Sequence, residues 1–236
     1  MLTLTVDIFI VVVGSIHVKM DRYNRNINER ISDAEIRIRE MVNVRSLIDG
    51  PPLDFEGWTM SPHFGKLIAQ IVSSHHPDTV VECGSGTSTI FTAHALNKYN
   101  TSGEIYVLEH MKKYKYKTDK LIQNHSCASR TQVILAPLCE HKIEDREQLW
   151  YDVTVGDSGV KSIDFLLVDG PPNETGPMAR YPAVPILKPL LSDDCVILVD
   201  DGDRPDVEKA VHKWAKDIHA DIEYTGGPGG SYILRR

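Results

Sequence analysis

Apolar and polar residues repeat with two different periods along most of this chain. Short apolar runs typical of buried strands alternate with segments of helical periodicity. The runs predict strands at residues 79–83, 104–108, 132–136, 162–168, 195–199, 221–224 and 231–234. The intervening patterns predict helices at residues 61–75, 88–99, 112–123, 179–191 and 206–219. Strands joined by helices are typical of a mostly parallel sheet that is covered on both faces.

The last two predicted strands depart from this alternation. Only Thr-Gly-Gly-Pro-Gly-Gly separates residues 221–224 from residues 231–234, and no helix fits in that length. Such a connection predicts a hairpin. We therefore expect an α/β fold with a doubly wound, mostly parallel, seven-stranded sheet that ends in an antiparallel C-terminal hairpin.

The N-terminal part predicts an extension outside this fold. Residues 1–17 are apolar apart from Asp7, and their β-branched content suits a strand as well as a helix. The uninterrupted run 8–16 is shorter than the about 20 residues that span a bilayer. Two roles of residues 1–17 stay open. They contact a membrane, or they pack against the body of the protein or against a partner subunit, as in a homodimer. Residues 20–47 predict an amphipathic helix, and we place the extension at 1–56 and the main domain at 57–236.

Composition and charge exclude several classes of protein. The 236 residues include 26 Lys and Arg against 33 Asp and Glu, a net charge of −7, which argues against a nucleic-acid binder. Four scattered cysteines without a C-x-x-C pair predict neither a disulfide scaffold nor a zinc site. A reduced, cytoplasmic setting is the default expectation, with membrane association through the N-terminus as the alternative.

A glycine-containing turn follows the first predicted strand. In Gly84-Ser85-Gly86-Thr87-Ser88 the glycines allow a ligand close to the backbone, and the next helix offers free N–H groups. The dinucleotide fingerprint requires a third glycine at the position of Thr89, so a nicotinamide dehydrogenase is disfavoured. A tight strand-to-helix turn is the structural alternative.

The second predicted strand ends in Glu109-His110, about 20 residues beyond the glycine turn. A carboxylate at that place can accept hydrogen bonds from a ribose diol. A solvated glutamate at a strand end is the alternative. Together with the glycine turn, Glu109 indicates an adenosine-type ligand that carries no pyrophosphate.

The fourth and fifth predicted strands end in Asp169 and in Asp200-Asp201. Three carboxylates at one sheet edge repel unless a cation or a proton shares the site, and Mg²⁺ is the simplest cation. The alternative for Asp201 is a turn before the helix at 206–219. Arg180 could pair with an acidic substrate group or with one of the aspartates, or lie on the surface at the start of a helix.

These motifs resemble those of class I S-adenosylmethionine-dependent methyltransferases, whose fold is Rossmann-like. Residues 80–86 (VVECGSG) resemble the first motif of that family, Glu109 its ribose-binding acid, and the terminal hairpin its reversed final strand. Residues 167–172 (LVDGPP) and 176–182 (GPMARYP) resemble the methyltransferase-24 group. The aspartates resemble those that hold magnesium in the metal-dependent catechol O-methyltransferase branch.

The resemblance implies transfer of a methyl group from S-adenosylmethionine to a small-molecule acceptor, at oxygen and with a divalent metal. The implied metal ligands are Asp169, Asp200 and Asp201, with Asp169 also catalytic. The residues implied at the cofactor are Glu82, Gly84, Gly86, Ser88, Glu109 and His110.

One position departs from the catechol branch, which places a lysine base where this chain has Pro172. The general base therefore stays open, and His110 and Tyr181 are candidates by position only. The alternative function is a non-catalytic, methyltransferase-like binding module that is tethered through its N-terminal helix.

Overall fold

The computed structural model describes residues 2–53, 60–99, 102–127, 129–152 and 159–236, with side chains from residue 19 onward. The chain divides into two compact units, Met1–Val42 and Asn43–Arg236. The domain boundary predicted after residue 56 lies within residues 54–59, outside the described residues.

The first unit is formed by one long helix, α1 (Leu2–Arg45), whose last three residues belong to the second unit, so residues 2–17 are helical rather than a strand. Most of the described side chains between residues 19 and 42 are exposed. Among residues with described side chains, no helix has a stretch that is long and apolar enough to cross a membrane. The side chains of residues 1–17 lie outside that part, and their membrane contact stays a hypothesis.

The second unit is built on a seven-stranded sheet with the order β3-β2-β1-β6-β7-β9-β8. β1, β2, β3, β6 and β7 are parallel, while β9 is antiparallel to both β7 and β8. The predicted doubly wound sheet and its terminal hairpin are thus confirmed. The strands are β1 (Thr79–Cys83), β2 (Glu104–Glu109), β3 (Thr131–Leu135), β6 (Ile163–Val168), β7 (Leu191–Asp200), β8 (Asp221–Tyr224) and β9 (Ser231–Arg235).

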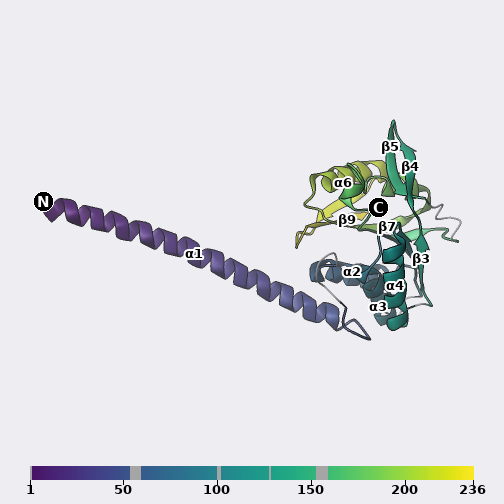
Figure 1. The fold of residues 1–236 in the computed structure, drawn as a ribbon, viewed down its shortest axis with the longest axis horizontal. Helices are drawn as coiled ribbons and strands as arrows, with labels where there is room; N and C mark the ends of the chain where they lie inside the picture. Colours follow the sequence, from purple (N-terminus) through teal and green to yellow (C-terminus); the bar gives the residue numbers. More distant parts are fainter. Residues whose placement is uncertain (1, 54–59, 100–101, 128, 153–158) are drawn as a thin grey trace. The chain divides into compact units, whose positions relative to one another are not determined.

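Helices cover both faces of the sheet, and each face has its own apolar core (Figure 1). One face carries α2 (Pro62–His75), α3 (Thr87–Lys98) and α4 (Lys112–Asn124). The other carries α5 (Ala183–Leu187) and α6 (Pro205–Ile218). The Ser61 hydroxyl accepts a 3.1 Å hydrogen bond from the Phe64 N–H and so begins α2 where the sequence predicted.

The structure differs from the prediction in two segments. The helix predicted at 179–191 shortens to α5 and the 3₁₀ turn η3 (Lys188–Leu190), because its prolines remove backbone donors; a second 3₁₀ turn, η2 (Asn173–Thr175), precedes α5. A separate hairpin, β4 (Leu138–Ile143) and β5 (Arg146–Tyr151), was not predicted. Its residues lack the regular alternation that indicates a strand, yet it buries Trp150 and Tyr151.

Candidate functional site

The order of the strands places the switch point of the sheet at the carboxyl ends of β1 and β6. Strand order reverses between these two strands, and ligands bind at such switch points in open α/β sheets. Cys83 is level with Val168, and Val168 with Val199, so the residues that follow them lie at one edge. The sheet therefore brings together the glycine turn, Asp169 and Asp200, as the sequence predicted.

Two glycines allow the loops after β1 and β6 to touch. Gly84 has a φ of +97°, and a Cβ at this position would lie 3.3 Å from the Gly170 nitrogen. A Cβ at Gly170 would lie 2.6 Å from the Tyr151 hydroxyl, so neither position has room for a side chain. Gly86 differs, because a Cβ there would meet no atom within 4 Å. The outer part of the turn thus faces open space.

Glu109 is buried at the end of β2 and is held on both of its carboxylate oxygens. Its Oε2 accepts a 2.6 Å hydrogen bond from the Ser85 hydroxyl, and its Oε1 accepts one of 2.7 Å from the Met111 N–H. The Thr118 hydroxyl donates to Ser85 Oγ at 3.1 Å, and His110 Nδ1 lies 3.3 Å from Glu109 Oε1. The carboxylate is therefore fixed in place beside the glycine turn.

Glu82 is a second buried carboxylate, beneath the same turn. The Ser88 hydroxyl donates to its Oε1, whereas its Oε2 has no hydrogen-bond partner among the described residues. Burial raises the pKa of Glu82 to about 7, against the opposing effect of the Ser88 hydrogen bond. Thr89, which breaks the dinucleotide fingerprint, accepts a 3.2 Å hydrogen bond from the Gly86 N–H. Glu82 Oε2 is thus a buried hydrogen-bond acceptor to which no described residue donates.

Arg180 lies among the aspartates at the ends of β6 and β7, with only 4% of its side chain exposed. Its guanidinium donates to the main-chain oxygens of Asp169 and Asp200 and to the carboxylates of Asp169, at 3.2 Å, and Asp201. Arg204 Nη1 lies 3.1 Å from the same oxygen of Asp201, Oδ2, that Arg180 contacts. Of the alternatives predicted for Arg180, the structure therefore confirms pairing with the aspartates, and Arg180 does not lie on the surface.

The magnesium site implied for Asp169, Asp200 and Asp201 does not fit this arrangement. Among the described residues, no three His, Cys, Asp or Glu side chains gather closely enough to hold a metal ion. The guanidinium of Arg180 already supplies positive charge to two of the three carboxylates. Arg180 thus offsets part of the repulsion between the aspartates, which was the reason to expect a cation.

The carboxyl groups of this cluster nevertheless keep raised pKa values. Burial first, and then the charge of Asp200, raise the pKa of Asp169, while Arg180 lowers it. Burial also raises the pKa of Asp200 to about 6. A carboxylate with a raised pKa is a stronger base than an ordinary aspartate.

Tyr151, from the hairpin that the sequence did not predict, also reaches this site. Its buried hydroxyl lies against Gly170 and has no hydrogen-bond partner among the described residues, and its ring packs edge-on against His110 at 6.2 Å. The adjacent aromatics Trp150 and Tyr151, which follow a polar run, are the one local signal from which a buried strand end could have been predicted. Tyr181, by contrast, donates to Glu144, and burial and this hydrogen bond raise its pKa to about 12. Tyr181 is therefore a poor base near neutral pH.

Comparison with solved structures identifies methyltransferases of the same fold. A methyltransferase from Geobacter sulfurreducens has a TM-score of 0.58 at 12% identity, covering 76% of this chain and 80% of that one. S-adenosylhomocysteine-bound PaMTH1 from Podospora anserina has a TM-score of 0.56 at 16% identity, covering 85% and 95%. An O-methyltransferase from Bacillus cereus with bound S-adenosylhomocysteine has a TM-score of 0.53 at 17% identity, covering 87% and 91%.

The sequence comparisons give the family. No curated protein sequence matches the chain. Residues 81–202, more than half of the chain, match the family model Methyltransf_24, which describes a methyltransferase domain. The matched segment runs from the glycine turn through Glu109, Asp169 and Arg180 to Asp201, so it contains all the site residues that the sequence predicted. The chain therefore belongs to the Methyltransf_24 family of methyltransferase domains.

Proposed function

We propose that this protein transfers a methyl group from S-adenosylmethionine to an oxygen atom of a small-molecule acceptor. The observation that carries the proposal is a pair of buried carboxylates, Glu82 and Glu109, that accept hydrogen bonds from serines of the open glycine turn. S-adenosylmethionine carries an ammonium group and a ribose diol, which both donate hydrogen bonds, and it supplies a sulfonium methyl group. The bound S-adenosylhomocysteine in the structures of PaMTH1 and the B. cereus enzyme supports this donor.

The residues around the glycine turn divide the recognition of the donor between them. Glu82 Oε2, which lacks a partner among the described residues, accepts from the ammonium group, and Ser88 holds Glu82 in position. Glu109 accepts from the ribose hydroxyls, the same kind of bond that it receives from Ser85. Gly84 and Gly86 keep side chains away from the ligand. His110, next to Glu109, lines the ribose end.

Asp169 and Arg180 act on the acceptor. Asp169, one-third exposed and with a raised pKa, takes the proton from the acceptor hydroxyl. Arg180 keeps Asp169 oriented and supplies the positive charge at this edge of the sheet. Arg180 already holds one carboxylate oxygen each of Asp169 and Asp201, two of the metal ligands expected from the sequence, so no step of this proposal runs through a metal.

Calorimetric titration of the full chain with S-adenosylmethionine and S-adenosylhomocysteine tests the donor site. Micromolar binding is expected, and Glu109→Ala weakens it by about 1–3 kcal/mol, because hydrogen bonds to a charged group are lost. Glu104→Ala is the matched control, since Glu104 lies exposed at the other end of β2 and leaves affinity unchanged. If the folded wild type binds neither ligand, the proposed function is wrong.

The reaction itself is tested by screening hydroxyl acceptors for S-adenosylhomocysteine formation, with and without EDTA. Turnover that persists in EDTA and is lost in Asp169→Asn supports the roles given to Asp169 and Arg180. Turnover that requires added Mg²⁺ contradicts them. Binding of the donor without turnover on any acceptor points instead to a non-catalytic module.

A further inference from the structure

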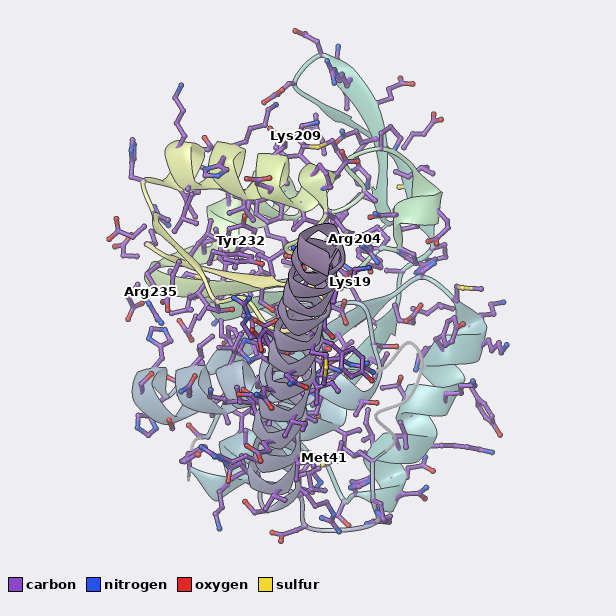
Figure 2. The ribbon with its side chains drawn as sticks, turned by 90° about the vertical axis from the view of Figure 1, so that its left-hand side faces the viewer. Lys19, Met41, Arg204, Lys209, Tyr232 and Arg235 are labelled. Atoms are coloured by element: carbon purple, nitrogen blue, oxygen red, sulfur yellow. The ribbon has the colours of Figure 1, made fainter. Side chains whose placement is uncertain are left out.

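An apolar stripe runs along α1 between residues 20 and 41. Its members follow one another at spacings of three, four and seven residues, which correspond to 3.5 residues per helical turn and keep them on one side of the helix. They are Met20, Ile27, Ile31, Ala34, Ile38 and Met41. Figure 2 looks along this helix, with Lys19 and Met41 marking the two ends of the stretch.

The stripe is exposed within its own unit. Met20, Ile31, Ile38 and Met41 are 57%, 52%, 62% and 44% exposed. A single straight helix has no surface of its own against which its apolar face could pack. Helices in proteins owe most of their stability to packing of such a face. The stretch is about 33 Å long at 1.5 Å per residue, which suits a partner that is itself an extended helix.

The residues of the stripe fit the two core positions of a heptad repeat. Asn24, Ile31 and Ile38 occupy one position, and Met20, Ile27, Ala34 and Met41 occupy the other. A single asparagine at the first position fixes the register and the oligomer state of a coiled coil, at a cost in stability. Asn24, the one polar residue among these core positions, is thus suited to fix which residues of the two helices lie opposite one another.

The charges that flank the stripe select the orientation of the partner. In a parallel pair, a residue beside the core faces the residue five positions later on the other helix, so Arg30 of each copy faces Glu35 of the other. In an antiparallel pair centred on Ile31, Arg30 would face Arg30 or Arg37 of the other copy, and these like charges repel. The charges therefore match a second copy of the same helix in parallel orientation.

We infer that residues 20–41 form a parallel two-stranded coiled coil with a second copy of this chain. The apolar stripes meet along the seam, and two Arg30–Glu35 pairs flank it. Parallel pairing brings the two copies of residues 1–17 to the same end of the coiled coil. This inference is independent of the proposed methyl transfer.

Sedimentation velocity of the full chain tests the association. The wild type is expected to sediment as a dimer, and the double variant Ile31→Asp/Ile38→Asp as a monomer. Ile36→Asp is the matched control, because Ile36 is 49% exposed on the opposite side of the helix, and this variant stays dimeric. A monomeric wild type, or a double variant that remains dimeric, overturns the inference. Near-UV circular dichroism verifies that the main domain of each variant is folded.

Oxidative cross-linking tests the orientation. In a Cys139→Ser background, whose three remaining cysteines are buried, Ile38→Cys is expected to form a disulfide dimer with itself. Ile36→Cys, the control, is not expected to cross-link. If Ile38→Cys cross-links to Asn24→Cys and not to itself, the helices are antiparallel and the inference is wrong.

Discussion

Glu82 makes the stability of this protein depend on pH in a predictable direction. Its pKa in the folded protein is about 7, raised by burial from an ordinary value of 4.5. Below pH 4.5 the carboxyl group is protonated in both the folded and the unfolded chain, and its contribution to stability is fully present. As the pH rises through 4.5 toward 7, the carboxyl group ionises in the unfolded chain but stays protonated in the folded protein. The unfolded state is thereby favoured, and the contribution of Glu82 to stability is lost.

The size of the effect follows from the two pKa values. At about 1.4 kcal/mol for each tenfold change in proton affinity, raising the pKa from 4.5 to about 7 corresponds to about 3 kcal/mol. Glu82→Gln has the same shape, keeps an oxygen that accepts from Ser88, and carries no charge at any pH. The free energy of unfolding of Glu82→Gln, relative to wild type, should therefore rise by about 3 kcal/mol between pH 4.5 and pH 8.5.

Urea unfolding of the full chain without ligand, followed by tryptophan fluorescence at several pH values, measures this difference. Taking the difference between the two proteins cancels the contributions of other titrating groups that the substitution leaves unchanged. Glu144→Gln is the control of opposite sign, because the hydroxyl of Tyr181 and the charge of Lys213 lower the pKa of exposed Glu144. A difference between Glu82→Gln and wild type that does not change with pH would refute the reasoning.

Three further substitutions test individual contacts by urea unfolding. Arg180→Met should cost about 3 kcal/mol at pH 8 and less at pH 5, because it leaves partly buried carboxylates without their countercharge; an equal cost at both pH values contradicts this. Tyr151→Phe should preserve stability or raise it by about 1 kcal/mol, since the lost hydroxyl has no partner among the described residues; a clear loss would reveal one. Ser61→Ala should cost about 1 kcal/mol through the lost α2 cap, and no change would contradict that role.

Much of the fold could be predicted because local patterns decided it. All seven strands of the main sheet were located to within a few residues, apart from an early start of β7, since buried strands are short apolar runs whatever their partners. The hairpin of β8 and β9 followed from the length and glycine content of its turn. The β4–β5 hairpin was missed. These two segments are strands because they pair with each other, and their own sequences carry no regular alternation that predicts it.

The site divides in the same way. The sequence by itself determined that the glycine turn, Glu109 and Asp169 lie at one edge, because parallel strands in a single sheet must end there together. Only the tertiary structure decided that the guanidinium of Arg180 pairs with both Asp169 and Asp201. Arg180 reaches the aspartates through a long-range arrangement of β6, β7 and the loop before α5, and spacing along the chain carries no information about such a contact.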